Sequence, residues 1–367
     1  MNYIIKLTNR CNLDCIYCHE KKRMRKSKLI LTESKMRNIL ETIEAYQKKA
    51  KDKNVRLQFT GGEALMVPYS MWKRYLGLVK EIFPKPYGVR LAMQTNLFHL
   101  TGKMIDLIKE YDIGVGASYD FNDYTRVDLK GRSSSKRVFK NMQRLRDADI
   151  DFGLICVVSN YNIDDMEKIY DYMISNGISF HFLPLNRAAY EYQKKLIIDP
   201  KHYANNLCSV IEKYVLDSKT DVEFTNGKSY SSIILKNARH DIQCTYGKSC
   251  GQNFIAIKGD GDAFTCPNCE FDEYCLGNIF DDGLEYIFDP SNPVQKKFRK
   301  RFSEATKRNT SCAKCKWRKI CNQGCPHESL QQGNFYRKSN FTCEVNRIIF
   351  PKLSKLYRSL GYETKVA

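Results

Sequence analysis

The sequence predicts an α/β fold in which a partial (β/α)6 barrel is followed by a small cysteine-rich α+β domain. Three observations predict it. Runs typical of strands alternate with amphipathic helical stretches up to about residue 220. Three cysteines stand directly behind the first of these runs, and cysteines become frequent again from Cys244 onward. Repeated strand–helix units favour a parallel sheet, and six of them suit an incomplete barrel whose sites lie at the carboxyl ends of the strands.

Six runs carry the strand pattern, and a helical stretch follows each of them. The predicted strands are residues 3–7, 55–59, 89–95, 113–119, 152–158 and 178–183. The clearest helix has Met36, Ile39, Leu40 and Ile43 at the i, i+3, i+4, i+7 spacing of one buried face. The other predicted helices are residues 71–82, 104–111, 138–145, 166–173 and 202–216. The helix at 71–82 should end before Pro84, because proline cannot continue a helix.

The second domain begins where turn-forming residues replace this alternation. We place the barrel at residues 1–225 and the cysteine-rich domain at residues 226–367. Residues 253–265 alternate around Lys258-Gly259-Asp260-Gly261, which predicts a β-hairpin. A basic helix is expected at the end of the chain, over residues 345–360.

Composition limits the class of protein. No run approaches the ~18 apolar residues of a membrane helix, and the cysteine loop starts at Cys11, which leaves no room for a signal peptide before it. We therefore expect a soluble, cytoplasmic protein. Fifteen cysteines without an export signal point to metal binding or catalysis rather than to disulfides. The net charge of +19 favours acidic partners, although surplus lysine is equally often a solvated surface.

The first cysteines, Cys11, Cys15 and Cys18, have C-x3-C-x2-C spacing. Three thiolates on one tight loop can hold three corners of a cubane iron–sulfur cluster. Such a cluster normally has four cysteine ligands. The fourth iron would then be open to a small molecule. The alternative is a zinc site, since cysteine clusters also bind zinc.

This loop, with Tyr17 just before the third cysteine, resembles the cluster loop of the radical S-adenosylmethionine (SAM) superfamily. The resemblance implies that Cys11, Cys15 and Cys18 are the catalytic cluster ligands and that the open iron binds SAM. It also implies reductive cleavage of SAM to a 5′-deoxyadenosyl radical that abstracts hydrogen from the substrate.

The resemblance also implies that Tyr17 of the cysteine loop and further residues at predicted strand ends contribute to the SAM site. They are Tyr17, Gly61, Gly62, Glu63, Gln94, Thr95, Asn96, Ser118 and Asp120. Glycines let the backbone approach a ligand closely, and the Glu63 carboxylate could accept a hydrogen bond from the SAM ammonium group. The alternative for each is ordinary turn formation or capping at a strand end. Arg126 follows in a pattern like the Asp-x-x-Arg of related maturases.

The late cysteines, in C-x2-C-x5-C-x3-C spacing with Cys343 beyond, resemble the SPASM domain, which holds two auxiliary [4Fe–4S] clusters. The resemblance assigns one cluster to Cys244, Cys250, Cys266 and Cys325. It assigns the other to Cys312, Cys315, Cys321 and Cys343. Three [4Fe–4S] clusters are therefore expected, with a pair of zinc sites as the alternative for the auxiliary two.

Four cysteines remain outside these sets. Cys156 and Cys208 lie in apolar stretches and are interpreted as core residues. Cys269 and Cys275 stay open between alternative ligands of the first auxiliary cluster and free thiols near it.

The hypothesis that best fits this set is a maturase that oxidises a ribosomally made peptide under anaerobic conditions, closing a thioether or carbon–carbon crosslink. In anaerobic sulfatase-maturing enzymes of the same architecture, an Asp base follows the third ligand of the first auxiliary cluster. Here Pro267 follows Cys266, which disfavours formylglycine formation. The expected partners are an acidic precursor peptide and an electron donor such as flavodoxin or ferredoxin. The peptide would be delivered by a separate leader-recognition protein or bound directly by the enzyme.

Two alternatives of other kinds remain. The same radical chemistry could act on RNA or on a small molecule, but no RNA-binding module is recognisable after the cysteines, so nucleic acid is not expected. A non-catalytic zinc or iron–sulfur binding protein is the third hypothesis, and metal analysis would separate it from the enzyme.

Overall fold

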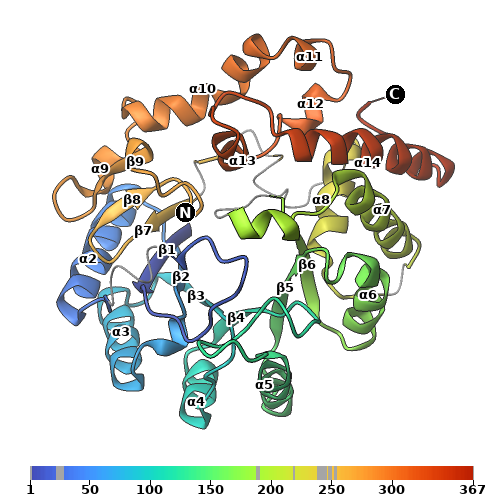
Figure 1. Ribbon diagram of the computed structural model, residues 1–367. Coiled ribbons are helices and arrows are strands. Elements are labelled where there is room, and N and C mark those ends of the chain that lie inside the picture. The colour runs from blue at the N-terminus through green and yellow to red at the C-terminus, as the bar shows by residue number, and fades with distance from the viewer. Residues whose placement is uncertain are drawn as a thin grey trace. The chain divides into compact units, whose positions relative to one another are not determined.

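The computed structural model describes residues 2–21, 29–186, 191–217, 220–237, 246, 250–251 and 254–366 (Figure 1). The chain forms two compact units. The first comprises Met1–Ser118, Arg126–Phe152 and Gly251–Phe298. The second comprises Tyr119–Thr125, Gly153–Cys250 and Arg299–Ala367.

The first unit is built on a mixed sheet with the strand order β4-β3-β2-β1-β7-β8-β9. Its strands are β1 (Asn2–Thr8), β2 (Asn54–Gly61), β3 (Gly88–Thr95), β4 (Ile113–Ser118), β7 (Phe254–Ile257), β8 (Asp262–Phe264) and β9 (Cys275–Asn278). β1 to β4 run parallel, and β7 pairs in parallel with the free edge of β1, with Asn2 opposite Phe254 and Ile5 opposite Ile257. β8 and β9 add antiparallel strands.

Four helices follow the first strands along the chain: α2 (Glu33–Lys49), α3 (Tyr69–Ile82), α4 (Gly102–Glu110) and α5 (Ser135–Asp147). Figure 1 shows them along the outer side of β1 to β4. The predicted face of α2 is confirmed, because Met36, Ile39, Leu40 and Ile43 are fully buried. The helix begins where the Thr32 hydroxyl accepts a hydrogen bond from the Lys35 amide at 3.3 Å, which satisfies one of the free amides of the first turn.

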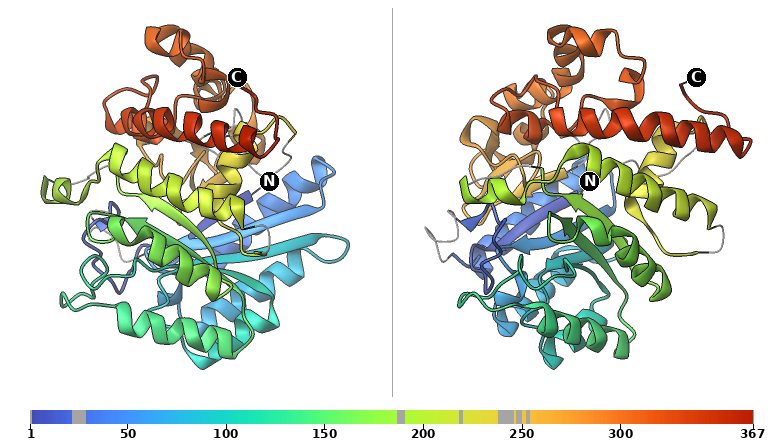
Figure 2. Two further views of the ribbon diagram at one scale, coloured as in Figure 1. Left: turned by 90° about the vertical axis from the view of Figure 1, so that its right-hand side faces the viewer. Right: turned by 45° about the vertical axis from the view of Figure 1, so that its right-hand side comes forward.

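The second unit contains β5 (Phe152–Val158) and β6 (Ser179–Pro184), which pair in parallel. Its larger helices are α6 (Met166–Ser175), α7 (Pro200–Leu216), α8 (Thr225–Ile234) and α14 (Asn340–Ser359). α14 packs along α7 (Figure 2). Three short helices follow in the region of the late cysteines: α11 (Thr310–Ala313), which contains Cys312, α12 (Arg318–Cys321), which ends at Cys321, and α13 (Pro326–Gln331).

The predicted α/β class, the hairpin at residues 253–265 and the helix at the end of the chain are confirmed. α9 (Gly283–Phe288) and α10 (Pro293–Arg308) had no sequence prediction. α10 carries seven lysines and arginines, so the polar and charged residues outnumber the apolar ones that mark a buried face.

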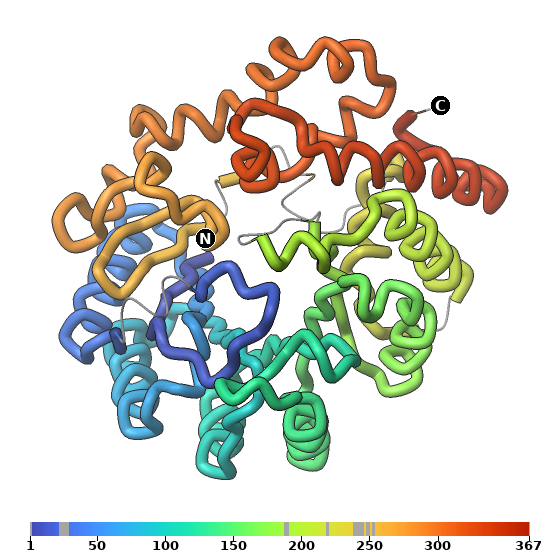
Figure 3. Tube along the Cα trace, viewed as in Figure 1, coloured from blue at the N-terminus to red at the C-terminus, as the bar shows by residue number. Residues whose placement is uncertain are grey.

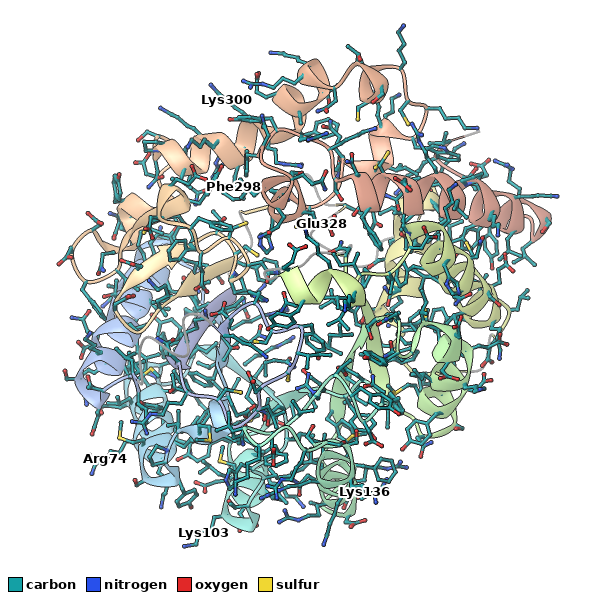
Figure 4. The ribbon with its side chains drawn as sticks, in the orientation of Figure 1. Arg74, Lys103, Lys136, Phe298, Lys300 and Glu328 are labelled. Carbon is teal, nitrogen blue, oxygen red and sulfur yellow. The ribbon has the colours of Figure 1, made fainter. Side chains whose placement is uncertain are left out.

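Basic side chains lie on the outer helices of the first unit. Arg74 on α3, Lys103 on α4 and Lys136 on α5 point away from the sheet (Figure 4). This placement fits the interpretation of much of the surplus charge as a solvated surface. Among the described helices, none has both the length and the apolar character needed to cross a membrane.

Candidate functional site

The loop that carries the first three cysteines leaves the carboxyl end of β1 and is dark blue in Figure 3. Cys15 is buried, and Cys11 and Cys18 are partly buried. The amide of Leu13 donates to Cys11 Sγ at 3.4 Å, and the amide of Cys18 donates to the carbonyl of Cys15 at 3.0 Å. The first bond contacts one of the sulfur atoms, and the second closes a backbone turn between two of the cysteines.

The three thiols lie within electrostatic reach of one another. Burial raises the pKa of Cys11 to about 12, and the negative charges of Glu63, Cys15 and Cys18 add to the effect. Burial, followed by the charge of Cys15, raises the pKa of Cys18 to about 11. A cationic metal centre would offset this crowding, because metals bind thiolates and release their protons. The donor set therefore fits the expected iron–sulfur cluster.

Two glycines bring the end of β2 against this loop. A Cβ on Gly61 would lie 2.3 Å from the carbonyl oxygen of Thr8, and one on Gly62 would lie 2.4 Å from that of Arg10. The amide of Gly62 donates to Thr8 at 2.8 Å, and the amide of Glu63 donates to Arg10 at 2.8 Å. The glycines are thus required by backbone contact with the cysteine loop, whatever they do for a ligand.

Glu63 joins the ends of β2 and β3. Its side chain is 2% exposed, and its Oε1 accepts from Thr95 Oγ1 at 2.6 Å while its Oε2 accepts from the amide of Asn96 at 2.6 Å. Burial raises the pKa of Glu63, and the hydrogen bonds from Thr95, Leu65 and Asn96 oppose that rise. The carboxylate therefore positions the strand ends, in addition to any contact with a ligand.

Asn96 carries the network on to the cysteine loop. Its Nδ2 atom donates to Asn12 Oδ1 at 2.8 Å and lies 3.8 Å from Cys11 Sγ. Beside it, Gln94 Nε2 donates to Ser118 Oγ at 3.2 Å, which joins the ends of β3 and β4. The structure thus brings the predicted residues of the first unit together around the loop.

Arg126 and Tyr17 form a second link to the loop. Arg126 is 8% exposed, and its Nη1 donates to Tyr17 Oη at 2.8 Å. The amide of Asp14 donates to the carbonyl of Val127 at 2.8 Å, so the backbone after Arg126 also pairs with the loop. The positive charge of Arg126 is one of the influences that lower the pKa of Glu63.

Asp120 belongs to the second unit. It is 1% exposed, and its Oδ1 accepts from the amide of Val157 at 3.0 Å while its Oδ2 accepts from Thr125 Oγ1 at 3.0 Å. Within that unit, Asp120 fastens its own turn to β5.

Four of the late cysteines share one electrostatic neighbourhood in the second unit. Burial raises the pKa of both Cys312 and Cys321, and the charges of Cys315 and Cys343 contribute in each case. The amide of Cys315 donates to the carbonyl of Cys312 at 3.1 Å. These are the four residues expected to hold one auxiliary cluster.

One ammonium group and one side-chain amide contact sulfur atoms of that set. Lys338 Nζ lies 3.8 Å from Cys343 Sγ, and Asn346 Nδ2 donates to Cys321 Sγ at 3.5 Å. Such donors stabilise thiolate over thiol. Among the described residues, no three His, Cys, Asp or Glu side chains could hold a single metal ion. The ligands of a cubane bind different iron atoms and need not meet at one point.

The other predicted set is described only in part. Cys244 lies outside the described residues. Cys266 follows β8 in the first unit, whereas Cys250 and Cys325 belong to the second, where Cys325 is the N-cap of α13. The amide of Asn268 donates to Cys266 Sγ at 3.4 Å.

Sequence reasoning missed a buried ionic group in the first unit. Lys6 Nζ on β1 lies 2.7 Å from Glu270 Oε1 and 3.4 Å from Glu20 Oε2. Glu20 closely follows Cys18, and Glu270 closely follows Cys266. A lysine inside an otherwise apolar strand is the signal that could have revealed it, because a buried charge needs a partner.

Two family models match this sequence. The radical SAM superfamily model matches residues 5–173, and the SPASM model, an iron–sulfur cluster-binding domain, matches residues 244–316.

Individual proteins resemble the chain over most of its length. It is 24% identical to the cysteine-type anaerobic sulfatase-maturating enzyme of Clostridium perfringens, over 93% of this chain and 92% of that protein. The solved structure of native anSMEcpe with bound AdoMet matches with a TM-score of 0.81 at 19% identity, covering 98% of both chains. The structure of Streptococcus suis SuiB bound to precursor peptide SuiA matches with a TM-score of 0.63 at 17% identity, covering 93% and 75%. These structural matches establish a shared fold.

Proposed function

This chain is a radical SAM enzyme with a C-terminal SPASM domain, and we propose that it oxidises a peptide substrate by hydrogen abstraction and closes a thioether or carbon–carbon crosslink. The observation that carries the proposal is the loop of Cys11, Cys15 and Cys18, held against Glu63 and Asn96 at the carboxyl ends of parallel strands. Such strand ends are where barrel enzymes place their chemistry.

The three loop cysteines would hold the SAM-binding cluster, and the two late sets would hold auxiliary clusters. When bound, SAM and the cluster on the first loop would supply the radical that removes a hydrogen atom, and the auxiliary clusters would accept the electron released by net oxidation. The protein's own residues set the geometry. Glu63 and Asn96 fix the strand ends against the loop, and Arg126 holds Tyr17 beside it at 2.8 Å.

A peptide is the substrate class that the comparisons favour. SuiB has been solved with a precursor peptide, and the sulfatase-maturating relatives act, by their names, on another protein. The net charge of +19 favours an acidic peptide, because opposite charges attract over a distance. We also propose an electron donor of the flavodoxin or ferredoxin type and a separate leader-recognition protein as partners.

Crosslinking is favoured over formylglycine formation by the residues after Cys266. Pro267 offers no titratable group, and the nearby Glu270 carboxylate accepts a hydrogen bond from Lys6 at 2.8 Å. The second candidate is nevertheless a sulfatase-maturase-like oxidation, because the similarity to the Clostridium perfringens enzyme extends over 93% of this chain.

The test is anaerobic reconstitution of the full chain, followed by incubation with SAM, a strong reductant and a candidate peptide. The peptide encoded next to the enzyme gene and a cysteine-containing sulfatase peptide are compared. Crosslinking predicts 5′-deoxyadenosine together with a neighbouring-gene peptide that is lighter by two hydrogen atoms. Conversion of the sulfatase peptide to an aldehyde would support the second candidate. Absence of 5′-deoxyadenosine would overturn both.

A further inference from the structure

Cys269 lies three residues after Cys266, in the turn Cys266-Pro267-Asn268-Cys269 that follows β8. We propose that Cys269 is a cluster ligand and that it binds the same auxiliary cluster as Cys266. The proposal rests on the chain being a radical SAM enzyme with a cluster-binding SPASM domain, and it does not depend on the substrate.

The turn has the backbone geometry of the other closely spaced cysteine pairs in this protein. The amide of Cys269 donates to the carbonyl of Cys266 at 3.0 Å. The same bond joins Cys18 to Cys15 at 3.0 Å and Cys315 to Cys312 at 3.1 Å. A hydrogen-bonded turn of this kind brings the first and fourth Cα atoms to within about 7 Å. All three C-x2-C pairs therefore hold their two cysteines close together across one hydrogen-bonded turn.

The sulfur of Cys266 also receives a backbone hydrogen bond, as Cys11 does in the SAM-cluster loop. Asn268 donates to Cys266 Sγ at 3.4 Å, and Leu13 donates to Cys11 Sγ at 3.4 Å. In both loops the donor is the second residue after the cysteine. A hydrogen bond to the charged form favours thiolate, which is the metal-binding form.

Cys269 is buried and directly precedes a buried ion-paired residue. Cys269 is 2% exposed, and the next residue, Glu270, is 6% exposed and ion-paired with Lys6. Cys275, in contrast, packs against the apolar cluster of Ile4, Ala256 and Phe264. Cys275 Sγ also donates to the carbonyl of Gly277 at 3.5 Å. Of the two cysteines that the sequence left open, Cys269 thus precedes a buried ion pair, whereas Cys275 lies against an apolar cluster.

The number of ligands makes the proposal exacting. A [4Fe–4S] cluster takes four thiolates, and the sequence assigns Cys244, Cys250, Cys266 and Cys325 to this one. If Cys269 is a ligand, one of Cys244, Cys250 and Cys325 is not. Single substitutions must therefore show that Cys269 is needed and that one of those three is dispensable.

The test uses the full-length chain with Cys11, Cys15 and Cys18 all replaced by alanine, so that only auxiliary clusters contribute iron. Into this background we would place Cys269→Ala, with Cys275→Ala as the matched control and Cys266→Ala as the positive control. Iron and sulfide per chain and the EPR spectrum after reduction are measured under anaerobic conditions. We expect Cys269→Ala and Cys266→Ala each to lose about half of the iron, while Cys275→Ala keeps it.

A second variant covers a failure to fold. Cys269→Ser keeps the size of the side chain, and an oxygen ligand in place of sulfur would change the EPR spectrum of the reduced cluster. Equal iron content and identical spectra in the Cys269 and Cys275 variants would overturn the proposal. The proposal would also be overturned if Cys244, Cys250 and Cys325 all proved necessary for the cluster. Neither readout involves the peptide, so a wrong substrate assignment would leave this result unaffected.

Discussion

The ammonium group of Lys6 on β1 lies 2.7 Å from the carboxylate of Glu270, although 263 residues separate them in the chain. The two side chains are only 10% and 1% exposed. Lys6 also lies 3.4 Å from Glu20, so one cation joins the end of the loop of Cys11, Cys15 and Cys18 to the turn after Cys266.

Removing one partner of this pair should destabilise the first unit. Lys6→Met would leave the Glu270 charge buried without its cation, which costs about 3–5 kcal/mol for such pairs. The double variant Lys6→Met/Glu270→Gln should recover most of this loss. Denaturant unfolding of the four proteins of the cycle gives the coupling energy. A double variant no more stable than Lys6→Met would contradict a direct pairing.

Gly62 should tolerate no side chain. A Cβ there would lie 2.4 Å from the backbone oxygen of Arg10, so Gly62→Ala must displace the cysteine loop. We expect SAM cleavage to fall by about 100-fold, the scale of an ångström-sized misplacement, as measured by 5′-deoxyadenosine formation. Gly77→Ala is the control, because Gly77 lies inside α3 with nothing within 4 Å of its Cβ position.

The control variant Gly77→Ala should be more stable than the original protein, because alanine is favoured over glycine inside a helix. We expect its free energy of unfolding to rise by about 0.5–1 kcal/mol. Unchanged SAM cleavage in Gly62→Ala would show that the loop does not depend on this contact.

His181 should make the fold sensitive to mild acid. Burial lowers the pKa of His181 on β6 from 6.5 to about 4. Between these two pH values the unfolded chain binds a proton at His181 and the folded chain does not. The free energy of unfolding should therefore fall by about 1 kcal/mol between pH 7.5 and 5.5 from this group. Urea unfolding at the two pH values measures it. In His181→Gln, the free energy of unfolding should change less between the two pH values, by that amount. An equal pH dependence in both proteins would show that His181 does not cause the loss of stability.

Lys338 should tune the cluster that we propose for Cys312, Cys315, Cys321 and Cys343. Its Nζ lies 3.8 Å from Cys343 Sγ, and a nearby cation stabilises an added electron. Lys338→Met should shift the reduction potential to a more negative value in an EPR-monitored titration, and Lys338→Arg should restore part of it. Lys300→Met is the matched control, since Lys300 is an exposed residue of α10 (Figure 4). An equal shift in both methionine variants would assign the effect to net charge alone.

The parts of the fold predicted from sequence are those written in short-range patterns. The face of α2 follows from four residues at helical spacing, and the C-x3-C-x2-C loop follows from cysteines within eight residues. The β7–β8 hairpin was also local, because its turn residues stand between two alternating runs. Such patterns arise because neighbouring residues share one element and one face.

The rest depends on contacts between distant residues. Glu63 holds Thr95 and Asn96 across more than thirty residues, a role that no local pattern shows. The pairing of Lys6 with Glu270 is more distant still. Cys269 and Cys275 look equivalent in the sequence, and only their surroundings tell them apart. The short helices α11 to α13 were not predicted, because helices of four to six residues are too short to show the 3.6-residue spacing of apolar side chains.

By pairing in parallel with β1, β7 covers an edge of the sheet that would otherwise be exposed. Residues Asn2 to Ile5 find backbone partners in Phe254 to Ile257, and without that strand they would form an open sheet border. Bare borders invite strands from other molecules and lead to aggregation. A protein shortened to its first 250 residues would thus lose solubility as well as cysteines, so the catalytic half cannot simply be prepared by truncation.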